Sequence, residues 1–140
     1  MPISINYIVV LIATVVSVAM GFLWYGPLFG KQWRALSGMK SEDMTPEMKK
    51  GMWKRYLLMI VGSLIMALVL ARNVVFSSVY LHISGVSAGL ETGFWNWIGF
   101  IAPVTLGSVL WEKKSWKLWV INNGYYLAAL LIMGMIVSIW

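Results

Sequence analysis

The chain has 140 residues, of which 60% are hydrophobic and only 11% charged, and its formal net charge at pH 7 is +6. Soluble domains carry about 25% charged residues, so this composition excludes an ordinary soluble enzyme, a disordered tail and a fibrous protein. It indicates a protein that lies in lipid, and its length fits one domain over residues 1–140. Cysteine is absent and histidine occurs once, so we expect no disulfide, no metal site and no cofactor.

Long runs without charge predict four transmembrane helices. A bilayer core about 30 Å thick needs roughly 20 helical residues. We expect spans near residues 5–24, 53–75, 93–111 and 118–139, packed as a compact all-α bundle. The apolar run 73–90 either extends the second helix or lies along the outer surface. A signal peptide would need a basic segment before the first span, and residues 1–6 have no Lys or Arg, so we expect this span to stay in the membrane.

The basic residues predict the orientation of the chain. Seven Lys and Arg follow the first span and three follow the third, while Arg72 lies toward the other side of the membrane. Basic loops stay in the cytoplasm. We therefore expect a multi-pass protein of the cell inner membrane with both termini outside the cytoplasm. This placement explains the positive charge without nucleic acid as a partner, and the lipid bilayer is the expected partner.

The first basic loop contains a pattern typical of a helix start. Thr45 is a suitable N-cap and Pro46 a suitable first helical residue. Met48, Met52 and Tyr56 follow at every fourth position, which predicts a short amphipathic helix. This helix either recruits a partner or anionic lipid, or serves only to fix the topology.

Small residues recur at four-residue spacing in the expected spans, a pattern that permits close packing of helices in lipid. The stripes are Ala13, Ser17 and Gly21; Ser63, Ala67 and Ala71; Gly99 and Gly107; Gly124 and Ala128; and Gly134 and Ser138. They fit contacts within one chain and contacts in a homo-oligomer equally well. Four helices enclose little volume, so a transport pathway would need a homo-oligomer. The first span is expected to break at Gly26 and Pro27.

Two groups of polar side chains are candidate sites. Arg72 and Glu91 are both expected at the outer boundary, as an ion pair or as two separately solvated charges. The inner boundary gathers Tyr25, Glu112, Asn122, Asn123 and Tyr126. An unpaired polar group in hydrocarbon costs several kcal/mol, so we expect these five to contact one another. They form either an interhelical hydrogen-bond cluster or a site for a headgroup or small solute that opens to the cytoplasm.

Four segments carry a resemblance to a known family. WYGPLFGKQW, GFWNWIGFIAP, LWEKKSWKLW and INNGYYL resemble sequences of the DUF1761 family, small bacterial membrane proteins of unknown function. The resemblance covers nearly the whole chain and implies a four-helix membrane protein. It implies no activity and no functional residue.

The residues favour a structural or accessory membrane subunit that presents its basic loop to a membrane-protein partner. The alternative is a small oligomeric channel or transporter for a small solute or lipid. No Asp or Glu lies inside an expected span, which argues against a proton-coupled carrier. An enzyme is the weakest hypothesis, because the five carboxylates and His82 show no acid–base or nucleophile pattern. We expect no catalysis.

Overall fold

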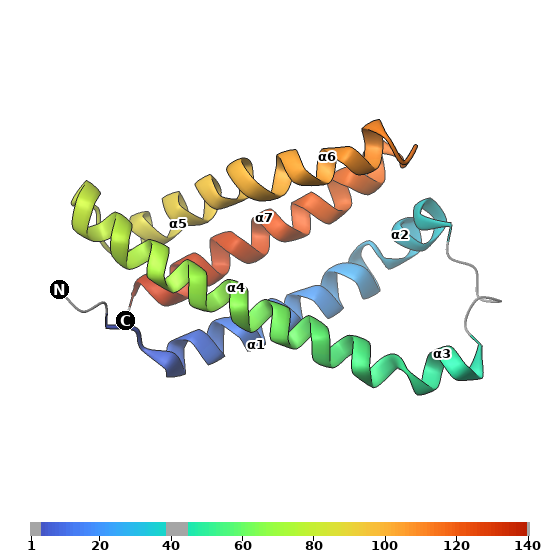
Figure 1. Cartoon of the computed structure of the whole chain (residues 1–140), viewed down its shortest axis with the longest axis horizontal. Coiled ribbons are helices and arrows are strands. Elements are labelled where there is room, and N and C mark those ends of the chain that lie inside the picture. Colours follow the sequence, from blue (N-terminus) through green and yellow to red (C-terminus); the bar gives the residue numbers. More distant parts are fainter. Residues whose placement is uncertain (1–3, 39–44, 140) are drawn as a thin grey trace.

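The computed structural model describes residues 4–38 and 45–139, which form helices and turns without any strand in these two ranges (Figure 1). In chain order the elements are α1 (Tyr7–Leu23), the π-helical turn η1 (Trp24–Leu28), α2 (Gly30–Ser37), α3 (Pro46–Lys50), α4 (Met52–Leu81), α5 (Gly85–Asn96), the π-helical turn η3 (Trp97–Ile101), α6 (Ala102–Leu110) and α7 (Trp116–Ser138). The predicted all-α fold is confirmed.

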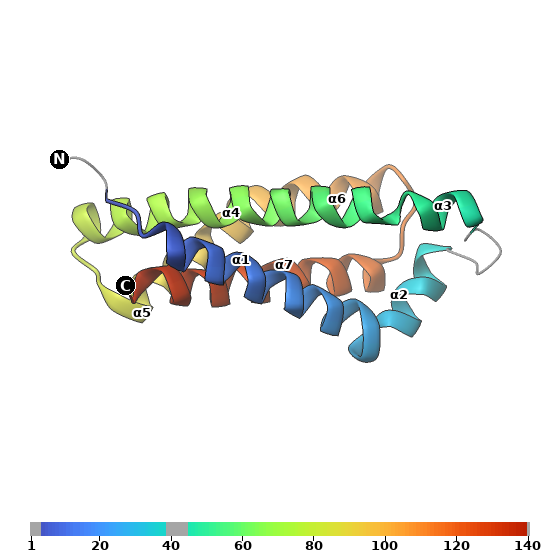
Figure 2. The same ribbon diagram turned by 90° about the horizontal axis from the view of Figure 1, so that it is seen from below.

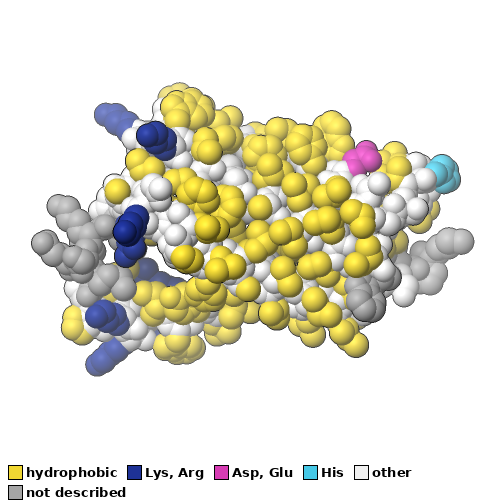
Figure 3. Space-filling model, turned by 180° about the vertical axis from the view of Figure 1, so that it is seen from behind, with side chains coloured by type: hydrophobic (Ala, Val, Ile, Leu, Met, Phe, Trp, Pro, Cys, Tyr) yellow, Lys and Arg dark blue, Asp and Glu magenta, His cyan; other side chains and the backbone are white. Residues whose placement is uncertain are grey.

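Four helical segments are long and apolar enough to cross a membrane: Tyr7–Leu28, Met52–Leu81, Gly85–Leu110 and Trp116–Ser138. The chain is therefore a multi-pass membrane protein. Figure 3 shows hydrophobic side chains around the middle of one face, with Lys and Arg at one end and Glu and His at the other. This distribution matches a bundle whose apolar middle lies in lipid and whose charged ends face water.

The two ends of the bundle differ in charge. The basic end comprises α2, α3, the start of α4 and the turn between α6 and α7. It carries Lys31, Arg34, Lys49, Lys50, Lys54, Arg55, Lys113, Lys114 and Lys117. At the opposite end, here the terminal end, α1 begins, α7 ends and α4 turns into α5 (Figure 1). Lys40, which the sequence also assigned to the basic loop, lies outside the described residues.

The third span begins earlier than predicted, at Gly85 instead of residue 93. The connection between α4 and α5 is short because His82 and Gly85 both adopt positive φ angles, 56° and 65°, and reverse the chain within a few residues. The run 73–90 consequently belongs mostly to the two helices. With 30 residues, α4 is about 45 Å long and extends beyond a bilayer core.

Both π-helical turns begin with a tryptophan that is hydrogen-bonded to α7. Trp24 Nε1 donates to the Ile121 carbonyl at 2.9 Å, and Trp97 Nε1 donates to the Asn123 carbonyl at 3.0 Å. Pro27 lies inside η1, and π-helical turns are one way in which a helix accommodates an interrupted hydrogen-bond ladder. The predicted break near Gly26 and Pro27 takes this form: the regular α-helix ends at Leu23 and the chain continues through Gly26 and Pro27 as a π-helical turn.

The chain leaves the first span at Phe29, whose φ of −123° is not helical. Helix α2 follows and ends at Gly38 in the left-handed region, with φ of 73°. The sequence analysis did not anticipate α2. Thr45 caps α3 as predicted, since its Oγ1 accepts from the Met48 N–H at 3.2 Å. However, α3 has five residues, less than two turns, and the predicted amphipathic helix is not confirmed.

Helix α7 lies at the centre of the bundle and packs against α1, α4, α5 and α6 (Figures 1 and 2). The core cluster consists of Val10, Ala13, Ala67, Leu70, Ala71, Ala129, Leu130 and Met133. Ala13 of α1 and Ala67 of α4 have no exposed surface, so the small-residue stripes of the first two spans lie where these helices meet α7.

Helices α5 and α7 approach most closely at glycines. A Cβ atom added to Gly93 would lie 2.6 Å from the Leu130 carbonyl oxygen, and one added to Gly89 or Gly134 would strike the backbone of the other. In contrast, a Cβ on Gly99 would meet nothing within 4 Å. The stripe predicted for the third span at Gly99 is thus wrong, since the close contact uses glycines one to three turns earlier.

Candidate functional site

A cleft of about 780 Å³ opens at the basic end among α1, η1, α4 and α7. Helices α1 and α4 pack closely near the middle of the molecule and separate toward this end (Figures 1 and 2). Small residues such as Ala13 and Ala67 meet in the core, whereas Phe22 and Tyr56 lie between the helices farther along, with ring centroids 5.6 Å apart. The larger side chains hold the two helices apart, which leaves the cleft between them.

The inner wall of the cleft is formed where η1 meets α7. Tyr25 Oη donates to Asn122 Oδ1 at 2.9 Å, next to the bond from Trp24 to the Ile121 carbonyl. Two adjacent residues of η1 therefore bind two adjacent residues of α7. These two bonds fix the Tyr25 ring and leave one edge of the Asn122 amide at the cleft.

A cluster of tyrosines continues this wall. Tyr125 Oη donates to the Ser17 carbonyl at 2.9 Å, and its ring lies 5.4 Å from that of Tyr25 and 5.5 Å from that of Tyr126. A Cβ on Gly21 would lie 3.1 Å from Tyr125 Oη, so glycine at this position lets the tyrosine reach α1. Aromatic pairs at such distances stabilise one another beyond the area they bury.

The opposite wall is apolar and rich in methionine. It is formed by Met48, Met52, Met59 and Met66, together with Phe22 and Tyr56. Methionine side chains are flexible and adapt to irregular ligands. Among the residues that the structure describes, Arg55 is the only charged one that lines the cleft. The cleft therefore combines a flexible apolar wall, hydrogen-bonding groups and one cation, which together suit a molecule with an apolar part and an anionic part.

In the part of the chain that the structure describes, no three His, Asp or Glu side chains lie close enough together to hold a metal ion. The described part of the cleft lining contains no carboxylate and no histidine. The chemistry available in the cleft is consequently binding through hydrogen bonds, apolar contact and one positive charge.

The comparison with known proteins identifies the family. Residues 8–138 match the family described as "Protein of unknown function (DUF1761)". The chain belongs to the DUF1761 family. No curated protein and no solved structure matches it. The cleft of this DUF1761 protein must therefore be interpreted from its own geometry.

Three of the five polar residues predicted for the inner boundary line the cleft, and two do not. Tyr25, Asn122 and Tyr126 lie together. Asn123 follows Asn122 on α7 and is rotated by about 100° around the helix, so it faces η3 and α6. Glu112 follows the end of α6 and is exposed in the turn before α7. The expectation that all five contact one another is wrong for these two residues.

Asn123 belongs to a separate buried network of this DUF1761 chain. Its side-chain oxygen accepts from Thr105 Oγ1 at 3.0 Å, and its amide nitrogen donates to the Trp119 carbonyl at 3.1 Å. Trp119 Nε1 donates to Thr105 Oγ1 at 3.1 Å. Asn123 is only 1% exposed, and both polar atoms of its side chain have a hydrogen-bond partner within the bundle. The interhelical hydrogen-bond interpretation fits this residue, and it also fits Asn122, whose side-chain oxygen accepts from Tyr25, although Asn122 in addition lines the cleft.

The predicted partners at the outer boundary, Arg72 and Glu91, are both exposed at or near the terminal end. No ion pair joins these two described residues. The neighbouring Asn73 is directed toward α5 instead, and its Nδ2 donates to Asn96 Oδ1 at 3.1 Å. Sequence reasoning missed this amide pair because Asn73 was read as part of an apolar run and Asn96 as part of an aromatic one.

Proposed function

We propose that this protein binds a lipid-like amphiphile with an anionic headgroup in the cleft at the basic end. The observation that carries the proposal is the composition of the described lining of the cleft, in which four methionines line one wall and Arg55 is the only charged side chain. A volume of about 780 Å³ lies within the usual range of ligand sites, about 300–1,000 Å³.

The ligand is oriented by the polarity of the cleft. Its apolar chain lies against Met59 and Met66, which are the lining methionines farthest from the basic end. Its headgroup lies near Arg55, close to the first turn of α4, and near the Tyr25–Asn122 pair, which supplies further hydrogen bonds. A basic residue near the membrane surface attracts anionic lipid by about 1 kcal/mol.

This orientation assumes a particular placement in the membrane. We propose that the basic end lies in the cytoplasm of a bacterial cell, that the protein lies in the inner membrane, and that both termini lie outside the cytoplasm. The proposal is supported by the nine described Lys and Arg residues at the basic end, because positive loops are retained on the cytoplasmic side. The role is binding without catalysis.

The proposed function is tested by native mass spectrometry of the purified chain with equal amounts of phosphatidylglycerol and phosphatidylcholine of the same acyl chains. We expect preferential retention of the anionic lipid, and we expect Arg55→Gln to reduce this preference about fivefold, the equivalent of about 1 kcal/mol. Lys114→Gln is the matched control, since Lys114 is exposed at the same end and does not line the cleft.

Two outcomes would overturn the proposal. One is an equal loss of preference in Lys114→Gln and Arg55→Gln, which would assign the effect to general surface charge. The other is the retention of no lipid by the folded wild-type chain. Tyr25→Phe provides an independent check, because it removes the hydroxyl bonded to Asn122 while preserving the ring and the charge of the cleft.

A structural or accessory subunit is the second candidate. It is supported by the many exposed cations on α2, α3 and the start of α4, which exceed what one ligand in the cleft requires. A membrane-protein partner with an acidic cytoplasmic surface would fit them. Lys49→Gln with Lys50→Gln separates the two roles, because neither residue lines the cleft. An accessory role predicts loss of the partner from native complexes with unchanged lipid preference.

A further inference from the structure

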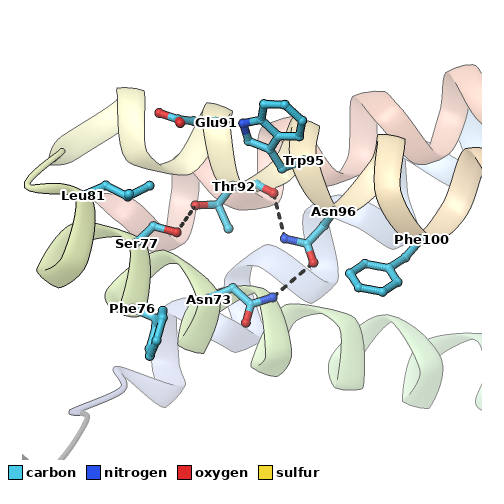
Figure 4. A pocket seen from close by; sticks show the side chains of 9 residues that line it. All are labelled: Asn73, Phe76, Ser77, Leu81, Glu91, Thr92, Trp95, Asn96 and Phe100. Atoms are coloured by element: carbon cyan, nitrogen blue, oxygen red, sulfur yellow. Dashed lines mark hydrogen bonds between the residues drawn. The ribbon is translucent and has the colours of Figure 1, made fainter.

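A second cavity, of about 270 Å³, lies at the terminal end between α4 and α5. Its lining residues are Asn73, Phe76, Ser77, Leu81, Glu91, Thr92, Trp95, Asn96 and Phe100. Figure 4 shows the four small polar side chains between the two helices, with Glu91 and Trp95 side by side on α5. This cavity shares no lining residue with the cleft at the basic end.

Hydrogen bonds organise the polar floor of this cavity. Asn73 Nδ2 donates to Asn96 Oδ1 at 3.1 Å, Asn96 Nδ2 donates to the Thr92 carbonyl at 2.8 Å, and Thr92 Oγ1 donates to Ser77 Oγ at 3.2 Å. None of these bonds uses the Asn73 side-chain oxygen. The other polar groups of the floor are held in place by their neighbours, and the Asn73 oxygen points away from Glu91 and Trp95 (Figure 4).

The charge of the cavity is negative. Glu91 is the only ionisable residue in the described lining, which does not include Arg72 although Arg72 precedes Asn73 in the chain. Three aromatic side chains, Phe76, Trp95 and Phe100, complete the rim. Of the three, Trp95 is the one that lies beside Glu91 (Figure 4). A carboxylate beside an aromatic ring attracts an ammonium group through ionic and cation–π interactions.

We propose that this cavity binds an ammonium group, supplied either by a small amine or by the amine headgroup of a lipid. Glu91 neutralises the positive charge, and Trp95 contacts it with its ring. The inference does not depend on the proposed lipid cleft, which lies at the other end of the bundle and would bind a ligand of opposite charge.

The experiment titrates the full chain, in phosphatidylglycerol nanodiscs, with choline and with its neutral isostere 3,3-dimethylbutan-1-ol, with binding followed by saturation-transfer NMR. We expect choline to bind about five- to tenfold more tightly than the isostere, as expected for cation–π and ionic contact at a partly exposed site. Glu91→Gln should remove this preference. Glu112→Gln should preserve it, because Glu112 is an exposed carboxylate at the other end.

Trp95→Leu gives a second readout, since it keeps the charge and removes the indole ring, and it should reduce choline affinity without raising that of the isostere. A second set of nanodiscs, containing phosphatidylethanolamine, distinguishes the two sources of the ammonium group. Competition by this lipid indicates a headgroup site, and unchanged choline binding indicates a site for a free amine. The proposal is overturned if the wild type binds choline no better than the isostere, or if Glu91→Gln leaves the preference intact.

Discussion

Replacing Gly93 by alanine tests the closest helix contact in the bundle. The added Cβ would lie 2.6 Å from the Leu130 carbonyl oxygen, whereas ordinary contact begins at 3.4 Å, so α5 and α7 would have to separate locally by about 0.8 Å (3.4 − 2.6). The atoms in the way belong to the backbone of α7 and cannot rotate aside. Overpacking of this kind costs about 1–3 kcal/mol.

Gly99→Ala is the matched control, because it lies in the same membrane span and its Cβ would meet nothing within 4 Å. Both substitutions add one methyl group to a helical segment, so the difference between the two variants isolates the cost of the contact. Thermal unfolding in one detergent, followed through the intrinsic fluorescence of the nine tryptophans, measures this difference. At about 2–4 °C per kcal/mol, we expect Gly93→Ala to unfold about 2–12 °C below Gly99→Ala.

Equal unfolding temperatures for the two variants would refute the reasoning. They would mean that α5 and α7 are not in backbone contact at Gly93, and that the order of the helices around α7 must be redrawn. Gly134→Ala is expected to behave like Gly93→Ala, because its Cβ would strike the Gly89 backbone from the other side.

Three further predictions follow from single contacts. Asn123→Ala should lower the free energy of unfolding by about 1–3 kcal/mol, because it leaves buried partners unpaired. Asn122→Ala should lower it less and act mainly on ligand binding. Chemical denaturation of both variants measures the two free energies. Trp24→Phe should cost about 1 kcal/mol through loss of the bond to Ile121, with Trp111→Phe, at a side chain that is 85% exposed, as the neutral control in the same assay. Because the chain has no cysteine, a single introduced cysteine reports the orientation of the chain. A membrane-impermeant maleimide should label Ser84→Cys in intact cells and Lys114→Cys only after permeabilisation. The reverse pattern would refute the proposed topology.

The sequence predicts the four spans because lipid imposes a simple requirement on length and charge, and these can be read directly from the residues. It does not predict which way a residue of α7 faces. A helix surrounded by α1, α4, α5 and α6 is apolar on all sides, so no polar face marks its orientation. For this reason Asn122 and Asn123 were assigned to one cluster, although about 100° of rotation directs them to different neighbours.

The close glycine contact was missed for a different reason. Ser84, Ser87 and Glu91 lower the hydropathy at the start of α5, so the span was expected to begin after Gly89. Sequence analysis then looked for small residues farther along, at Gly99. One pattern in the sequence could have predicted the apolar wall of the cleft. Met52, Met59 and Met66 recur every seven residues, a spacing that keeps side chains near one face of a helix.

The same seven-residue spacing continues to Asn73, so one face of α4 contributes to the cleft at the basic end and to the cavity at the terminal end. Between Met66 and Asn73 the helix rises only about 10 Å. That interval is occupied by Leu70, which packs with Leu130 and Met133 of α7 in the core and is 2% exposed. The two cavities therefore end against the same core from opposite sides. Passage between them within one chain would require α7 to move away from α4, and the glycine contact with α5 holds α7 in place. The described geometry thus keeps the two cavities of one chain separate, and each can be tested without affecting the other.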